Sequence, residues 1–276
     1  MNNFPLVSVI VPCYNHERYV LNMLNTILVD NYPNKEIIII DDGSTDKSNH
    51  IITEWIKTNR SSLVIKYKTR KNKGVCGTLN ELIRLSTGKY ILPIASDDLL
   101  IPDSITNRIE ILENNPDKMV LITDSLVIDE NDNIIMDSTI VDYNKGDKLS
   151  FYSEEGILLS TLTKPQISGP SVLMKSEIFN LIGEYKENLI AEDWYFYQRC
   201  AALKLIVFKD IICSKYRVHS NNSSGIRIKR SSKMAWTIVL TYWYNWNFMP
   251  SNKYKIVSIK EMLKWFVRYI TYKIKK

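Results

Sequence analysis

Residues 35–46 read KEIIIIDDGSTD, and they carry the clearest fold signal in the sequence. Four consecutive isoleucines form a short apolar run that ends directly in acidic and turn residues. Such a run is typical of a strand buried on both faces of a parallel sheet. Gly43 permits a tight turn after the strand, and Asp46 can cap the helix that follows. The stretch therefore predicts a strand, a turn and a helix in succession.

Apolar runs and helical patterns alternate on both sides of this stretch, up to residue 124. Strands that alternate with helices specify a parallel α/β sheet, in which ligands bind beyond the carboxyl ends of the strands. After residue 124 the pattern weakens to a helix at 192–203 and strand-like segments at 205–209 and 211–218. The earlier strands are predicted at 6–11, 35–40, 63–67, 90–95 and 119–123, with helices at about 17–29, 46–57, 78–85 and 104–113.

The composition is that of a soluble globular protein, with 45% hydrophobic and 24% charged residues in 276 positions. The four cysteines show no CxxC spacing, which favours a reduced compartment. The N-terminus has no basic, apolar leader, and no run predicts a convincing transmembrane helix. These features predict a cytoplasmic protein.

Two adjacent carboxylates, Asp97 and Asp98, follow the predicted strand at 90–95. They would repel one another unless a cation or sugar hydroxyls compensated them. Mg²⁺ and Mn²⁺ prefer oxygen ligands and bridge to substrate phosphates. The pair therefore indicates a metal site, and the alternative is a pair of residues capping a helix.

Polar residues also follow the first two strands. Tyr14 offers an aromatic face for a base, and Asn15 offers an amide for hydrogen bonding. Asp42 can accept a hydrogen bond from a base or ribose, although an ordinary strand–turn–helix junction is the favoured interpretation of this motif on its own. The basic run at 70–74, which ends at Gly74, is either near a nucleotide or a solvated loop.

Glu192 and Asp193 begin a predicted helix and precede aromatic residues that would exclude water. A carboxylate in such a setting can act as a general base, and helix capping is the alternative. Arg217 and His219 close a predicted strand and could neutralise a pyrophosphate. His16 is assigned no role.

The joint order VSVIVPCYN, IIIIDDGSTD, NKG, GKYILPIASDD, AEDW and YRVH resembles the family-2 glycosyltransferases of the GT-A fold, over residues 6–220. The resemblance implies a mainly parallel central sheet flanked by helices. It also implies transfer of a sugar from a nucleotide-sugar donor, with uridine diphosphate as the expected carrier. Two departures are present: Ala95 or Ser96 replaces the first acid of an Asp-x-Asp, and residues 77–80 read GTLN where many relatives have Ala-Arg-Asn.

Carried over to this chain, the resemblance implies a nucleotide side made by the ends of the first strands. Pro12, Tyr14 and Asn15 would lie near the base, which Asp42 would help to hold. The NKG motif ends at Gly74 and belongs to the same side.

The resemblance assigns the remaining roles to later motifs. Asp97 would face the donor ribose or sugar, and Asp98 would coordinate Mg²⁺ or Mn²⁺ on the diphosphate. Arg217 and His219 would close over the diphosphate. Asp193 of the Glu-Asp motif would be the catalytic base, with Glu192 beside it.

One base and one in-line displacement imply inversion at the anomeric carbon, because retention would need a carboxylate nucleophile. The sequence alone does not exclude Glu192 as such a nucleophile. Two rival functions are a sugar nucleotidyltransferase, which usually has a Gly-rich phosphate loop, and a non-catalytic Mg²⁺-binding module. This chain has no glycine at 12–15, which disfavours the nucleotidyltransferase. The Mg²⁺-binding module leaves residues 192–193 and 217–219 unexplained.

The charge lies at the C-terminal end of the chain. Residues 251–276 carry eight Lys/Arg and one acid, a net +7, and the whole chain is +6, so residues 1–250 sum to −1. This disfavours nucleic acid as a partner. Apolar residues recur at helical spacing from Ile259 to Ile274, as in helices that lie on anionic membranes, although packing on the domain or on a partner is the alternative.

A membrane-bound helix would suit a lipid-linked saccharide acceptor, with bacterial surface polysaccharide or O-antigen assembly as the setting by family analogy. The enzyme would then be peripheral at the inner face of the cell membrane. We divide the chain into a catalytic domain at 1–225, with a nucleotide-binding half at 1–124 and an acceptor-side half at 125–225, and a helical extension at 226–276.

Overall fold

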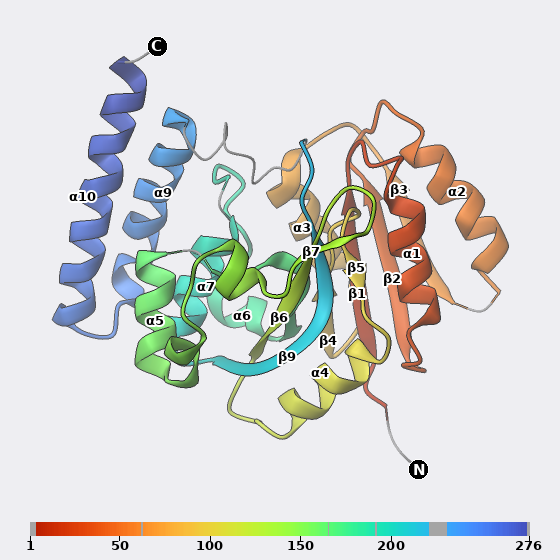
Figure 1. The fold of residues 1–276 in the computed structure, drawn as a ribbon, viewed down its shortest axis with the longest axis horizontal. Coiled ribbons are helices and arrows are strands. Elements are labelled where there is room, and N and C mark those ends of the chain that lie inside the picture. The colour runs from red at the N-terminus through yellow and green to blue at the C-terminus, as the bar shows by residue number, and fades with distance from the viewer. Residues whose placement is uncertain (1–3, 62, 165, 191, 221–230, 275–276) are drawn as a thin grey trace.

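The computed structural model describes residues 4–61, 63–164, 166–190, 192–220 and 231–274. One mixed sheet crosses the molecule, helices cover both of its faces, and a pair of helices from the C-terminal part stands on one flank (Figure 1). Among the described residues the sheet has nine strands, in the order β3-β2-β1-β4-β8-β6-β9-β5, with β7 paired to β6.

The first half of the chain forms the parallel part of the sheet. β1 pairs in parallel with both β2 and β4, and β2 pairs in parallel with β3. Every residue of β2 is buried, as the isoleucine run predicts. The predicted alternation is confirmed by β1 (Val7–Cys13), α1 (Val20–Val29), β2 (Lys35–Asp41), α2 (Ser48–Asn59), β3 (Val64–Thr69), α3 (Gly74–Leu85) and β4 (Tyr90–Pro93).

The second half extends the sheet with both strand directions. β8 (Val172–Lys175) is antiparallel to β4 and to β6 (Val120–Ile128), whereas β9 (Ile206–Arg217) runs parallel to β6. The two strand-like segments expected at 205–209 and 211–218 form this single strand. Register shifts along β6 accompany the strong curvature of β9 (Figure 1), as bulges bend strands. The short strands are β5 (Leu99–Leu100) and β7 (Ile134–Met136).

The helices of the second half include one that the sequence did not predict. α5 (Glu154–Thr163) contains Gly156 and several β-branched residues, which weaken its helical signal. The Ser153 side chain caps it, and packing against α7 stabilises it. The other helices are α4 (Ser104–Glu113), α6 (Ile178–Ile182) and α7 (Glu192–Ala202), with short helical turns η1 (Thr139–Tyr143), η2 (Lys148–Tyr152) and η3 (Gly169–Ser171).

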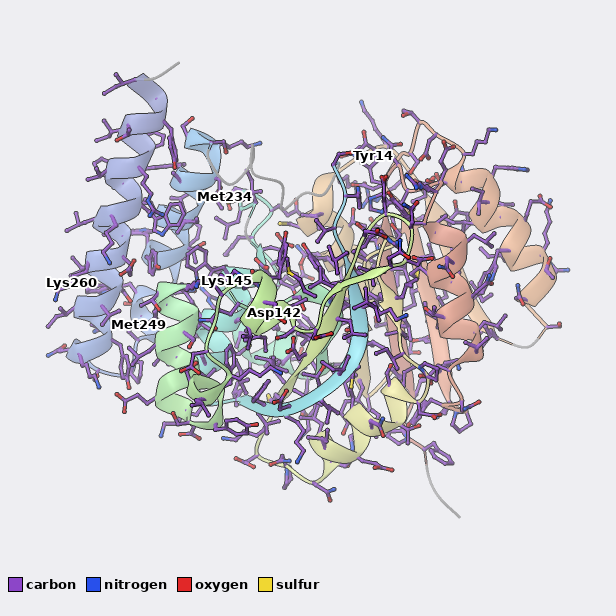
Figure 2. The ribbon with its side chains drawn as sticks, in the orientation of Figure 1. Tyr14, Asp142, Lys145, Met234, Met249 and Lys260 are labelled. Atoms are coloured by element: carbon purple, nitrogen blue, oxygen red, sulfur yellow. The ribbon has the colours of Figure 1, made fainter. Side chains whose placement is uncertain are left out.

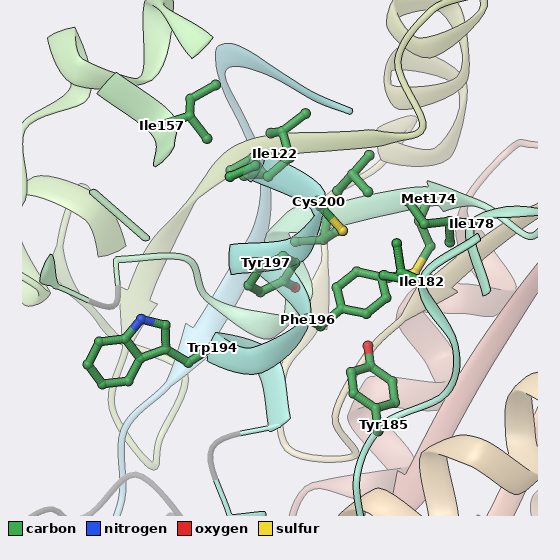
Figure 3. Close-up of a cluster of buried hydrophobic side chains, with 14 of the residues drawn as sticks. Ile122, Ile157, Met174, Ile178, Ile182, Tyr185, Trp194, Phe196, Tyr197 and Cys200 are labelled. Atoms are coloured by element: carbon green, nitrogen blue, oxygen red, sulfur yellow. The ribbon is translucent and has the colours of Figure 1, made fainter. Parts of the chain in front are cut away.

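Two hydrophobic cores lie on the two faces of the sheet. Successive isoleucines of β2 alternate between them, because side chains alternate across a strand: Ile38 belongs to one core, and Ile37 to the other. The first core contains the aromatic residues of α7, of which Trp194, Phe196 and Tyr197 are seen in Figure 3. The start of α7 is thereby held rigidly against the sheet.

The C-terminal helices are α9 (Ser232–Asn245) and α10 (Asn252–Ile274), joined through η4 (Trp246–Phe248). They lie side by side, and α9 contributes Ile238 and Tyr242 to the same core as α7. The predicted domain boundary at 225/226 falls outside the described residues, so the division stays a prediction. Within the described ranges, no helix has both the length and the apolar character needed to cross a membrane.

Candidate active site

The loop after β4 carries the two adjacent carboxylates at the carboxyl edge of the sheet. Asp97 and Asp98 are both buried, and the N–H of Asp98 donates to the carbonyl of Ala95 at 3.1 Å to close a turn. The two side chains have different partners. Asp97 faces two imidazoles, whereas the carboxylate of Asp98 accepts the backbone N–H of Arg217 at 2.9 Å.

Asp97 forms a compact cluster with His16 and His219. Nε2 of His219 lies 3.0 Å from Oδ2 of Asp97, and Nε2 of His16 lies 3.8 Å from the same oxygen. The ligand atoms of the three residues all lie within 4.8 Å of one another. Nδ1 of His16 is 2.7 Å from the hydroxyl of Ser96, which holds the ring in place. We call this group the His–Asp–His cluster.

The His–Asp–His cluster has the donor set of a divalent-metal site. Two imidazole nitrogens and a carboxylate suit a first-row transition ion such as Mn²⁺ better than Mg²⁺, which prefers oxygen ligands. The sequence prediction named Asp98 as the metal ligand and gave His16 no role. The signal that could have found His16 is its position in the turn directly after β1, at the same edge of the sheet as Asp97.

The pKa values of the two adjacent carboxyl groups are shifted in opposite directions. Burial opposes ionisation of Asp97, but the hydrogen bond with His219 and the charges of His16 and His219 outweigh it, so the pKa of Asp97 lies below its usual value. Burial, followed by the charge of Asp97, raises the pKa of Asp98 well above its usual value. Burial also lowers the pKa of His16 and so favours its neutral form.

Arg217 lies beneath the cluster, and its side chain is 1% exposed. Its Nε donates to the carbonyl of Asp97 at 2.6 Å, and Nη1 donates to the carbonyl of Asp129 at 2.9 Å. The guanidinium also pairs with Asp132 and lies over the ring of Tyr19. These contacts tie the carboxylate loop to the end of β9 and to the turn at 129–133. The structure thus buries the guanidinium among protein groups, whereas the sequence suggested a role over a diphosphate.

The predicted nucleotide side lies at the ends of β1 and β2. Asn15 has a positive φ of 54°, and its side-chain oxygen accepts the N–H of Thr45 at 2.7 Å. This amide therefore joins the two strand ends. The ring of Tyr14 is left 47% exposed at the upper edge of the molecule (Figure 2). Pro12 lies within β1, opposite Ile40.

Asp42 anchors the loop that leads into α3. Its carboxylate accepts the backbone N–H groups of Lys73 and Gly74, each at 2.9 Å, and pairs with Arg70. Gly74 has a φ of +79°, which favours glycine at this turn. Asp42 and Gly74 are thus joined by a direct hydrogen bond, and their assignment to the nucleotide side stays a prediction.

Glu192 and Asp193 form a second acidic pair, at the start of α7. Burial, with the charge of Asp193, raises the pKa of Glu192 to about 8, and burial also raises the pKa of Asp193. Oδ1 of Asp193 accepts the N–H of Trp194 at 2.7 Å. Asp193 lines a small depression with residues of α5 and α7 and of the connection between α5 and η3: Ser160, Thr161, Lys164, Gln166, Ile167, Trp194 and Tyr197.

The chain matches the sequence model described as Glycosyl transferase family 2 over residues 8–182. It is similar to an uncharacterized glycosyltransferase of Methanocaldococcus jannaschii, with 27% identity over 91% of this chain and 83% of that protein. An uncharacterized glycosyltransferase of Rickettsia conorii is 30% identical over 79% of this chain, which spans only 35% of that protein.

Solved structures share the fold. Staphylococcus aureus TarS 1–349 in complex with UDP-GlcNAc has a TM-score of 0.69 and 19% identity, covering 96% of this chain and 73% of that one. The mannosyltransferase PcManGT of Pyrobaculum calidifontis, in complex with GDP-Man and Mn²⁺, has a TM-score of 0.68 and 19% identity, covering 95% and 70%. Because the family match spans more than half of the chain, this protein belongs to glycosyltransferase family 2 and is an enzyme with the GT-A fold.

Proposed function

We propose that the protein is an inverting, metal-dependent glycosyltransferase that moves a sugar from a nucleotide-diphosphate sugar, with UDP as the carrier, onto an acceptor hydroxyl. The observation that carries this proposal is the convergence of His16, Asp97 and His219 at the carboxyl edge of the sheet. The solved UDP-GlcNAc and GDP-Man complexes of proteins with this fold support a nucleotide-sugar donor. Membership of a glycosyltransferase family disfavours both the nucleotidyltransferase and the non-catalytic module.

In this proposal Asp97 and His219 hold the metal ion, with His16 as a third ligand. Asp97 thus takes the metal-binding role that the sequence assigned to Asp98. His16, Asp97 and His219 would hold the ion, which would supply positive charge toward the leaving diphosphate. Asp98 and Arg217 position the loop that carries Asp97, since they join it to the end of β9.

The nucleotide side keeps its predicted members. The exposed ring of Tyr14 is available to stack on the base. Pro12 and Asn15 shape the strand end that carries this ring, because Asn15 is bonded across to Thr45. Asp42 and Gly74 set the loop that borders the base, through the hydrogen bond between them.

Asp193 takes the proton of the acceptor hydroxyl as the oxygen attacks the anomeric carbon. A raised pKa suits this role, because a base is most effective when its pKa lies near the operating pH. Glu192, with a pKa of about 8, keeps its proton at neutral pH and is a poor nucleophile there. A protonated Glu192 supports a single base, a single displacement and inversion.

The acceptor in this proposal is a lipid-linked saccharide of bacterial surface polysaccharide synthesis, such as O-antigen. The basic C-terminal extension supports it, because a peripheral membrane contact would bring the enzyme to such a substrate at the inner face of the membrane. The depression beside Asp193, lined by Trp194 and Gln166, is the acceptor side.

The experiment that tests the function is a panel of nucleotide-sugars incubated with the full chain. Release of nucleoside diphosphate with Mn²⁺, and its loss in excess chelator, is the expected result for at least one donor. Nuclear magnetic resonance of the anomeric proton shows the configuration of the product. A product with retained configuration would contradict the single-displacement mechanism. Cleavage of every donor at equal rates with and without metal would contradict the metal site.

A further inference from the structure

α10 has two different faces. One face packs against the core of the molecule through Tyr254, Val257, Met262 and Trp265, and Ser258 is buried at its centre. The other face consists of large apolar side chains that are between 38% and 78% exposed. We call these residues the outer stripe: Ile256, Ile259, Leu263, Phe266, Val267, Ile270 and Ile274.

The outer stripe is continuous along the helix. Its members follow one another at intervals of three or four residues, apart from the adjacent Phe266 and Val267, which places them on one side of an α-helix. Helical geometry sets this side opposite Ser258 and Trp265, so it points away from the protein. Polar side chains normally occupy the outward face of a surface helix, and a long apolar patch there marks a binding surface.

Basic residues flank the outer stripe on both sides. Lys260 and Lys264 lie on one side and Lys255 on the other, and Figure 2 shows Lys260 at the outer flank of the molecule. Glu261 is the one acidic residue in the sequence of α10, and it pairs with Lys264. The exposed side of α10 is therefore apolar at its centre and positive at its edges.

We propose that the outer stripe docks in the plane of an anionic lipid bilayer, with α10 lying on the surface. An apolar stripe with cationic edges matches the acyl boundary and the anionic headgroups of such a surface. A second copy of this chain fits less well, because two outer stripes in contact would bring their lysines together, and the one acid of α10, Glu261, is already paired with Lys264. None of the described helices is both long and apolar enough to span a bilayer.

The docked helix is connected to the catalytic helix. On its inner face, the ring of Trp265 lies 6.0 Å from the ring of Trp194 in an edge-to-face arrangement. Trp194 follows Asp193 directly, and its indole N–H donates to the carbonyl of Thr161 in α5. Docking would thus hold the start of α7 at a fixed position above the membrane. This step rests on the proposed function, because a lipid-linked acceptor would approach from that surface.

The test uses the full chain and vesicles of phosphatidylcholine with or without phosphatidylglycerol, at low and high salt. The double variant Leu263→Gln/Val267→Gln removes apolar surface from the centre of the outer stripe. The matched control is Leu21→Gln/Val29→Gln, which changes two exposed apolar residues of α1 far from α10 (Figure 1). Cosedimentation measures binding, and circular dichroism checks that both variants fold.

The wild-type protein should bind to the anionic vesicles, and high salt should weaken this binding without abolishing it. The stripe variant should bind at least about tenfold more weakly, and the control should bind as the wild type does. Equal binding of the stripe variant and the wild type, or no binding of the wild type at low salt, would overturn the proposal. Light scattering without lipid provides a second check. A dimer that forms in the wild type and is lost in the stripe variant would also overturn the proposal, because it would assign the surface to a second copy of the chain.

Hydrolysis of a soluble nucleotide-sugar distinguishes this proposal from the proposed function. Hydrolysis should be the same in the wild type and in the stripe variant, because the outer stripe lies on the side of α10 that faces away from α7. If the protein binds lipid but hydrolyses no nucleotide-sugar, the proposed function is contradicted and the proposed docking surface is still supported.

Discussion

Nε2 of His219 lies 3.0 Å from Oδ2 of Asp97, although 122 residues separate them in the chain. The contact joins the residues just beyond β9 to the loop after β4, two segments that the sheet brings to one edge. The buried Arg217 reinforces it, because this residue binds the carbonyl of Asp97 and the carboxylate of Asp98. The late YRVH motif and the Asp-Asp motif are therefore parts of one site.

Replacing His219 by Ala should weaken the affinity for Mn²⁺ by on the order of 10–100-fold, because it removes one nitrogen donor and the partner that orients Asp97. Isothermal titration of Mn²⁺ in the presence of UDP measures this change. The matched control is His50→Ala, because His50 is an exposed histidine of α2. Wild-type affinity in His219→Ala would show that the metal is bound elsewhere.

Replacing Asp193 by Asn should lower the rate of sugar transfer by roughly 10²–10⁴-fold, because the side chain can no longer accept a proton. Donor affinity should not change. Steady-state kinetics with saturating donor and acceptor separates the two effects. Glu192→Gln is the control, and its rate should stay within about tenfold of the wild type. An equal or larger loss in Glu192→Gln would assign the base or a nucleophile to Glu192.

The contribution of Glu192 to the stability of the protein should fall as the pH rises from about 4.5 to about 8. The pKa of Glu192 is raised from 4.5 to about 8 in the folded state, so the folded protein keeps a proton that the unfolded chain releases in this window. The unfolding free energy then decreases with pH, at most by about 1.4 kcal/mol per pH unit for one proton. Below this window both states are protonated, and above it both are ionised.

Urea unfolding between pH 4 and 9 measures this slope. Glu192→Gln should flatten it, whereas Glu187→Gln, which changes an exposed neighbour, should leave it unchanged. An identical slope in Glu192→Gln and the wild type would mean that Glu192 ionises normally in the folded protein.

Arg217→Lys should destabilise the protein by on the order of 3 kcal/mol, because a lysine cannot reproduce the fork of bonds to Asp97, Asp129 and Asp132. Chemical denaturation measures the loss. Arg18→Lys is the control, since Arg18 contacts the same turn from the surface and should cost no more than about 1 kcal/mol. Equal, small effects of both substitutions would show that Arg217 does not hold the loop together.

The sequence predicted the parallel half of the fold well, because its strands are continuous apolar runs between clear turns. It did not predict α5, whose glycine and β-branched residues form a helix only when packed against α7. It divided β9 in two, because polar residues near Lys209 and Asp210 interrupt the apolar pattern.

The sequence could name candidate site residues by their position in the chain, but it could not give the direction of their side chains. Asp97 and Asp98 are neighbours, and spacing alone cannot tell which of them faces the histidines. His16 carried no motif of its own, since its place in the His–Asp–His cluster depends on His219 and Asp97 approaching from other segments. The buried contacts of Arg217 likewise depend on the turn at 129–133.

The most direct test of the central claim compares two isosteric changes at adjacent positions, Asp97→Asn and Asp98→Asn. Mn²⁺ binding in the presence of UDP is measured through the electron paramagnetic resonance signal of the free ion. Asp97→Asn should lose tight binding, because the Asp97 carboxylate lies between His16 and His219 as the oxygen donor of the cluster. Asp98→Asn should retain it, because that side chain faces the backbone of Arg217. Retention in Asp97→Asn with loss in Asp98→Asn would contradict the account and place the metal on Asp98.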